Sequence, residues 1–110
     1  MTFLYLNSNA MGSGDVELGK KLLKIFLEKL AASDIQVDLV GCVNSAIWLT
    51  SAGSEVLDSL KQLMDKGARI ATCGTCLDHY QLRDQLQIGE IGSMDQTVQI
   101  MARADKIIRP

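Results

Sequence analysis

Hydrophobic positions follow two different periods along the chain, and the change from one period to the other predicts strands and helices in turn. Five short apolar runs have the length and composition of strands, at residues 3–6, 35–43, 69–72, 87–91 and 106–108. Four segments between them repeat apolar residues every three or four positions, as amphipathic helices do, at residues 15–32, 54–66, 76–86 and from 93 onward. The pattern therefore alternates strand and helix from end to end.

The predicted helices have recognisable ends and apolar stripes. Asp15 stands where an N-cap carboxylate stabilises the first helix, Gly67 supplies a stop for the second, and Ser93 to Gln96 is a capping-box sequence for the last. The apolar stripe of the first helix is expected along Leu18, Leu22, Phe26 and Leu30, with Leu23 and Leu27 beside it. In the second helix it is expected along Val56, Leu57, Leu60, Leu63 and Met64, and in the last along Met94, Val98 and Met101.

This alternation predicts an α/β fold, a three-layer α/β/α sandwich with a mostly parallel sheet of about five strands, because parallel neighbours need helical crossovers. With 110 residues the chain is expected to form one domain over residues 1–110. In such sheets ligands sit at the carboxyl ends of the strands. Asn7 with its glycine loop, Asn44, and the segment from Cys73 to Cys76 are all expected at that edge.

Composition and charge narrow the functional classes. Hydrophobic residues make up 47% of the chain and charged residues 22%, as in ordinary globular proteins, and the net charge is -2 with scattered basic residues. No nucleic-acid or membrane partner is therefore expected. The chain has neither an apolar stretch of roughly 18 to 20 residues nor a recognisable signal peptide, which predicts a cytoplasmic location.

Three cysteines carry the clearest chemical signal. Two of them form the motif Cys73-Gly-Thr-Cys76 at a strand-to-helix turn. Cys73 is expected at the strand tip and Cys76 in the first helical turn, where unpaired N–H groups and the helix dipole favour a nucleophilic thiolate. Gly74 lets the backbone turn tightly and lets a second molecule approach.

Three chemistries suit this motif. The first is a persulfide relay through one activated cysteine, and the second is a dithiol-disulfide redox switch. The third is a zinc site built from Cys42, Cys73, Cys76 and His79, which has the weakest support because no second C-x-x-C motif is present. Neither a metal nor another cofactor is predicted.

The alternative from another functional class is a non-catalytic oligomeric module that binds an anion or a protein at the strand ends. Trp48 and Met11 are expected in loops, at an oligomer interface or a cleft wall.

Four segments of the chain carry a family resemblance, namely GSGDVELGKKLLKIFL, NSAIWLTSAGSEVLDSLKQLMDKGARI, TCGTCLDHY and ADKIIRP. Together they resemble the DsrE/DsrF-like superfamily, and most closely the DsrE-like domain of YedF-type proteins linked to sulfur and selenium metabolism. The resemblance implies an α/β/α fold, a homo-oligomer (dimer, trimer or hexamer) and sulfurtransferase-like activity as a sulfur, or selenium, carrier.

The resemblance also implies roles for single residues. Cys73 corresponds to the cysteine that bears the persulfide, and Cys76 is its partner or resolving thiol, while Asn44, Gly74 and Thr75 shape the pocket. The implied partners are a cysteine desulfurase or a TusA-like carrier. YedF-type proteins usually carry a TusA-like domain before this one; none precedes Met1, so the donor is expected in trans. Many relatives have a glycine where this chain has Gln81, which is expected to alter the segment after the motif.

Overall fold

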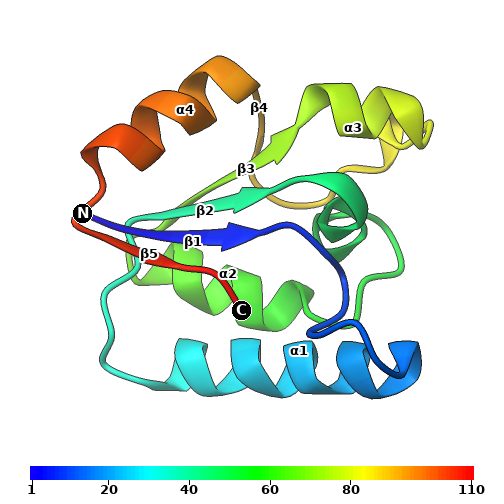
Figure 1. Ribbon diagram of the computed structural model, residues 1–110, viewed down its shortest axis with the longest axis horizontal. Coiled ribbons are helices and arrows are strands. Elements are labelled where there is room, and N and C mark those ends of the chain that lie inside the picture. Colours follow the sequence, from blue (N-terminus) through cyan, green and yellow to red (C-terminus); the bar gives the residue numbers. More distant parts are fainter.

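The computed structural model describes residues 1–110 as strands and helices in alternation (Figure 1). The strands are β1 (Thr2–Leu6), β2 (Leu39–Cys42), β3 (Arg69–Cys73), β4 (Glu90–Gly92) and β5 (Lys106–Ile108). The α-helices are α1 (Val16–Ala32), α2 (Leu57–Asp65), α3 (Gly74–His79) and α4 (Met94–Arg103). Two 3₁₀ helices, η1 (Asn44–Thr50) and η2 (Arg83–Gln85), complete the chain.

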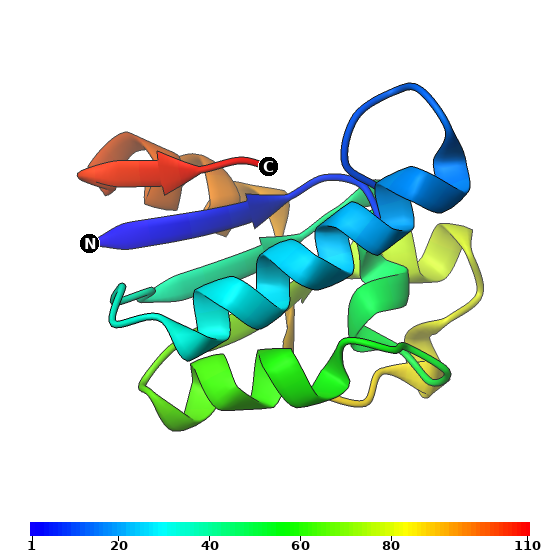
Figure 2. The same ribbon diagram turned by 90° about the horizontal axis from the view of Figure 1, so that it is seen from below.

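The five strands form one parallel sheet in the order β4-β3-β2-β1-β5. Helices α1 and α2 cover one face, and α4 lies over the other (Figures 1 and 2). Because β4 and β5 are the two edge strands, α4 has to cross the sheet between them. The predicted α/β sandwich with a five-stranded parallel sheet is confirmed.

The main core lies between the sheet and the pair α1 and α2. Alternate residues of β1, β2 and β3 point into it, among them Leu4, Val40 and Ile70. From α1 the core takes Leu23, Leu27 and Leu30. The prediction for α1 was therefore partly wrong: Leu18 and Leu22 are 53% and 42% exposed, since the buried face runs through Gly19, Leu23 and Leu27 instead. In α2, Leu60 and Leu63 are buried as predicted, whereas Met64 is exposed.

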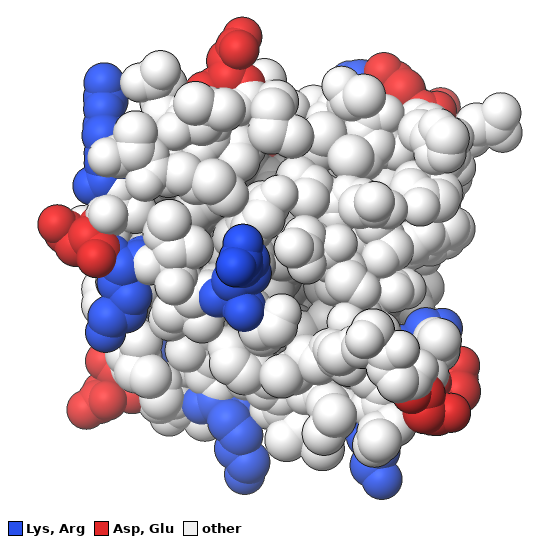
Figure 3. All heavy atoms as spheres, in the orientation of Figure 1, with Lys and Arg blue, Asp and Glu red and all other residues white.

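The opposite face of the sheet is covered less completely. None of the residues of α4 is fully buried, and its predicted apolar stripe leaves Met94 and Val98 exposed. The helix still begins as predicted, because the Ser93 side chain and the Gln96 side chain each bind the other residue's backbone N–H in a capping box. On the face shown in Figure 3, charged side chains are separated by wide uncharged areas.

The structure corrects the bounds of four predicted elements. β4 runs over Glu90–Gly92 rather than residues 87–91. β2 begins at Leu39, since residues 35–38 form the connection from α1. α2 begins at Leu57 rather than near residue 54, and it ends as predicted with Gly67 at a φ of 109°. α3 begins at Gly74 and ends at His79, well short of residue 86.

The early end of α3 has a local cause at Gln81, whose φ of 56° lies in the left-handed region. Its N–H donates to the Asp78 carbonyl and the N–H of Leu82 donates to the Leu77 carbonyl, so the helix closes in a Schellman motif. Leu77 and Leu82 also pack together, as that motif requires. Gln81 therefore adopts the turn conformation that glycine usually supplies at the end of a helix.

Among the helices, none is long and apolar enough to pass through a membrane.

Candidate functional site

Cys73 and Cys76 lie at the junction of β3 and α3, at the carboxyl edge of the sheet (Figure 1). Cys73 is the last residue of the strand and the N-cap of the helix, which makes Cys76 its third helical residue. Gly74 follows the strand at a tight place: a Cβ there would lie 3.0 Å from Ile91 Cγ2 and 3.1 Å from an Arg83 side-chain nitrogen. A small residue is needed at this turn because β4 and the segment after α3 press against it.

The two thiols lie side by side but differ in exposure. Cys73 is buried, with 7% of its surface exposed, and it lines a small, mostly apolar cavity of about 30 Å³ between the sheet and α4. Cys76 is half-buried and packs against the small cluster of Ile47, Leu77 and Leu82. A partner approaching from solvent therefore reaches Cys76 more easily than Cys73.

Asn44 places a backbone donor on the sulfur of Cys76. Its φ of 53° is left-handed, a conformation that asparagine tolerates better than most residues. In this conformation its N–H donates to Cys76 Sγ at 3.2 Å, and its side-chain oxygen accepts a hydrogen bond from the Tyr80 hydroxyl at 3.1 Å. Asn44, which the sequence analysis places at the site, therefore contacts Cys76 directly.

The segment that carries Asn44 is held against β3 by buried hydroxyls. The hydroxyls of Thr50 in η1 and Thr72 in β3 share a hydrogen bond of 2.8 Å, and both side chains are fully buried. Thr50 also donates to the carbonyl of Ile47 at 3.1 Å. A satisfied buried pair of this kind fixes η1 relative to the cysteine motif.

The surroundings of Cys76 act against the thiolate that its helix position predicts. Burial is the largest cause that raises its pKa above the ordinary value, and the neighbouring Cys73 raises it further. The N–H of Asn44 acts in the opposite direction and lowers the pKa. A pKa raised above the ordinary value of a thiol favours the protonated form of Cys76 at neutral pH.

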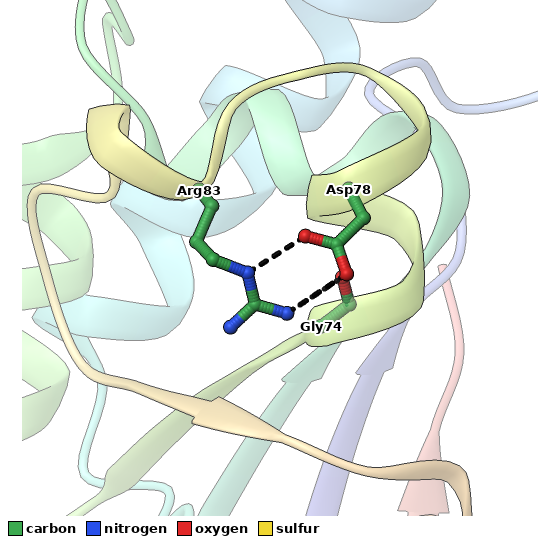
Figure 4. Close-up of polar contacts among 3 residues, drawn as sticks. All are labelled: Gly74, Asp78 and Arg83. Carbon is green, nitrogen blue, oxygen red and sulfur yellow. Dashed lines mark hydrogen bonds and ion pairs between the residues drawn. The ribbon is translucent and has the colours of Figure 1, made fainter.

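An ion pair missed in the sequence fixes the outer side of the motif (Figure 4). Arg83 donates to both carboxylate oxygens of Asp78, at 2.7 and 3.0 Å, and also reaches the carbonyl of Gly74 at 3.4 Å. This contact lowers the pKa of Asp78 and raises that of Arg83. Oppositely charged residues five positions apart are too common for the sequence to predict this ion pair. The turn at Gln81 brings Asp78 and Arg83 together, and the sequence does not predict that turn.

Three aromatic side chains gather next to Asn44, the residue whose N–H contacts Cys76. The Trp48 and Tyr80 rings meet edge to face with centroids 6.1 Å apart, and the His79 ring lies 5.1 Å from that of Tyr80. Trp48 is 41% exposed and Tyr80 is 37% exposed. We call Trp48, His79 and Tyr80 the aromatic rim. The sequence predicts Trp48 in a loop, whereas the structure places it in η1.

No side-chain hydrogen bond links the other predicted residues, Thr75 and the loop from Asn7, to Cys73 or Cys76. Thr75 is exposed in the first turn of α3, and Asn7 is exposed after β1. The glycine loop after β1 folds back on α1, since the N–H of Met11 donates to the carbonyl of Gly19 at 2.9 Å. Within this loop, the N–H of Asn9 donates to the Ser45 hydroxyl at 3.1 Å, which ties it to η1.

Cys42 is separate from this pair in character. It is 1% exposed in the main core, and burial raises its pKa to about 12. The zinc alternative requires Cys42, Cys73, Cys76 and His79 as ligands, and no group of three or more such side chains is arranged to hold a metal ion. The geometry instead favours thiol chemistry at Cys73 and Cys76.

Comparisons with known proteins agree with the fold. The model of the DsrE/DsrF-like family matches residues 35–110, which include the cysteine motif. The ychN protein from E. coli superposes with a TM-score of 0.68 at 17% identity, covering 99% of this chain and 97% of that one. MTH1491 from Methanobacterium thermoautotrophicum, a protein of unknown function, superposes with a TM-score of 0.67 at 19% identity and the same coverage. No curated protein matches the chain. At these identities the structural matches establish the fold alone.

Proposed function

This chain belongs to the DsrE/DsrF-like family, which is generally linked to sulfur metabolism, and on that basis we propose that it is a sulfurtransferase-like sulfur carrier. In this proposal a donor protein transfers sulfane sulfur to the motif Cys73-Gly-Thr-Cys76, and the sulfur then passes on. The observation that carries the proposal is a pair of adjacent free thiols at the carboxyl edge of the sheet, one of them open to solvent.

The family resemblance ranks Cys73 first as the persulfide-bearing residue, whereas exposure favours Cys76 as the thiol that meets the donor. Cys76 is half-buried beside the aromatic rim, whereas Cys73 is covered. The N–H of Asn44 is already directed at Cys76 Sγ, where it would stabilise a negatively charged sulfur. Gly74 and Thr75 contribute the turn between the two sulfurs. Selenium in place of sulfur, and YedF-type proteins as the nearest relatives, belong to the same proposal.

A sulfur-transfer assay tests the proposal. The reduced chain is incubated with a cysteine desulfurase and sulfur-labelled cysteine, and the label on protein is counted before and after a TusA-like carrier is added. We expect label on the chain itself in the wild type, and none on the chain when Cys73 and Cys76 are both replaced by serine. Equal labelling of the wild type and the double variant would contradict the proposal.

The aromatic rim supports a protein as the donor. Exposed tryptophan and tyrosine beside a reactive atom are typical of the central residues of protein interfaces. We therefore propose that the donor docks over Trp48 and Tyr80 while its persulfide reaches Cys76.

A homo-oligomer remains a prediction. Exposed apolar side chains on β4, α4 and β5 support it, namely Ile91, Met94, Val98 and Ile107.

Trp48→Ala is expected to slow loading from the desulfurase at least about tenfold, as loss of a central interface tryptophan does. Loading from a small inorganic polysulfide should change little, because it needs no docking surface. Met64→Ala is the matched control, since Met64 is also an exposed apolar side chain but lies on α2. The docking proposal would be wrong if both donors slowed equally, or if the Met64 variant matched the Trp48 variant.

A further inference from the structure

The two cysteines of the motif stand at neighbouring positions at the start of α3. Cys73 is the N-cap of α3 and Cys76 is its third residue. Side chains at the N-cap and at the third helical position lie close together, as the capping box shows, although Cys73 itself makes no side-chain cap hydrogen bond. The Cys73 thiol is also one of the groups that raise the pKa of Cys76, which agrees with this proximity. Both are free thiols, as is the distant Cys42.

Their unequal exposure gives the two sulfurs different roles. Cys76 is the thiol that an external donor meets, while Cys73 is covered by β4, pairing with Gly92, and by the turn at Gly74. A covered thiol cannot attack an external partner. The electrophile that Cys73 reaches is therefore a persulfide on Cys76.

We propose, building on the proposed sulfur-carrier function, that Cys73 discharges a persulfide on Cys76 as hydrosulfide and leaves a disulfide between Cys73 and Cys76. Cys73 loses its proton to solvent, and its sulfur attacks Cys76 Sγ. The bond between Cys73 Sγ and Cys76 Sγ forms while the bond from Cys76 Sγ to the sulfane sulfur breaks. The sulfane sulfur takes the electron pair and leaves as hydrosulfide. It is reduced, and the two cysteine sulfurs are oxidised, so no external oxidant takes part.

The geometry favours attack on Cys76 Sγ over attack on the outer sulfur. Cys73 is covered and Cys76 is half-buried, so the outer sulfur of a persulfide on Cys76 has open space on the solvent side, while Cys76 Sγ stays on the side of the covered Cys73. Attack on the outer sulfur would instead move the persulfide to Cys73 and release nothing. A small dithiol reductant, such as a thioredoxin-type protein, returns the disulfide to two thiols for the next cycle.

A single-turnover experiment tests this step. Wild type, Cys73→Ser and Cys73→Ala are loaded without air by a cysteine desulfurase and cysteine, separated from both, and left without reductant. Released sulfide is measured by colorimetry, and the Cys73–Cys76 disulfide by mass spectrometry of unreduced peptides. We expect the wild type to release one sulfide for each disulfide formed. Both variants should keep the persulfide on Cys76 and release sulfide at least about tenfold more slowly, since the attacking thiolate is absent.

Two results would overturn the inference in different ways. If the Cys73 variants load sulfur and the wild type keeps its persulfide equally long, or releases sulfide without the disulfide, Cys73 does not discharge Cys76 and the carrier function still stands. If neither Cys73 variant nor the wild type gains sulfur while a TusA-like carrier does, the carrier function itself fails, and the discharge step fails with it. Two substitutions at Cys73 are used so that a folding defect in one does not decide the outcome.

Discussion

Between about pH 9 and about pH 12 the folded chain is expected to lose about 4 kcal/mol of its free energy of unfolding through Cys42 alone. Burial raises the pKa of Cys42 from 9.0 to about 12, so the fold favours the neutral thiol. The stabilisation is fully present below the pKa of the unfolded chain. It is lost as the pH rises toward the pKa of the folded state, because the unfolded chain ionises first.

Urea unfolding of the wild type and Cys42→Ala across this pH range measures the effect. Tyrosines, lysines and the other cysteines titrate in both proteins, so the difference between the two stabilities isolates Cys42. At about pH 8 the variant should be the less stable protein, because it leaves a cavity in the main core. Its deficit should shrink and then reverse as the pH rises. A difference that stays constant with pH would contradict the pKa of Cys42.

Gly89→Ala is expected to cost about 3 kcal/mol or more in the free energy of unfolding. Gly89 has a φ of 78°, and a Cβ there would lie 2.5 Å from the carbonyl oxygen of Ile70. Both the left-handed backbone and the collision oppose a side chain. Since Gly89 leads directly into β4, which covers Cys73 and Gly74, the substitution should also raise the rate at which a thiol reagent modifies Cys73.

Gly12→Ala provides the matched control for this substitution. Gly12 has nearly the same φ, 77°, but nothing lies within 4 Å of its Cβ position. The Gly12→Ala variant should therefore lose about 1 kcal/mol of its free energy of unfolding, the part that comes from the left-handed backbone. Chemical denaturation of both variants separates the two contributions. Equal losses for the two variants would mean that the close approach to Ile70 has no energetic consequence.

The sequence pattern was sufficient for the parts of the fold that local chemistry determines. The N-cap at Asp15, the stop at Gly67, the capping box at Ser93 and the strand at residues 106–108 were all predicted and are confirmed. The stripe of α1 was harder to predict, because Leu18, Leu22, Leu23 and Leu27 surround much of the helix. Only packing against the sheet decides that Leu23 and Leu27 are the buried ones.

The candidate site was predictable in position but not in detail. Strand ends in a parallel sheet meet at one edge, so Asn44 and the Cys73–Cys76 motif were expected together, and the Asn44 N–H on Cys76 Sγ bears this out. The Arg83 clamp and the aromatic rim depend on the left-handed turns at Gln81 and Asn44. Gln81 is not a glycine, so its own identity does not predict the turn, and Asn44 tolerates the left-handed conformation without requiring it. The protonated state of Cys76 depends on burial, which the local sequence does not contain.

In the proposed function, sulfane sulfur reaches this chain at Cys76. Peptide mass spectrometry after loading by a cysteine desulfurase tests it most directly, because each single serine variant retains only one cysteine of the motif. We expect the mass of one additional sulfur atom on the motif peptide of Cys73→Ser, removed by a thiol reductant, and no addition in Cys76→Ser. Addition to Cys73 in the Cys76→Ser variant, with Cys76 unmodified in the Cys73→Ser variant, would contradict the claim.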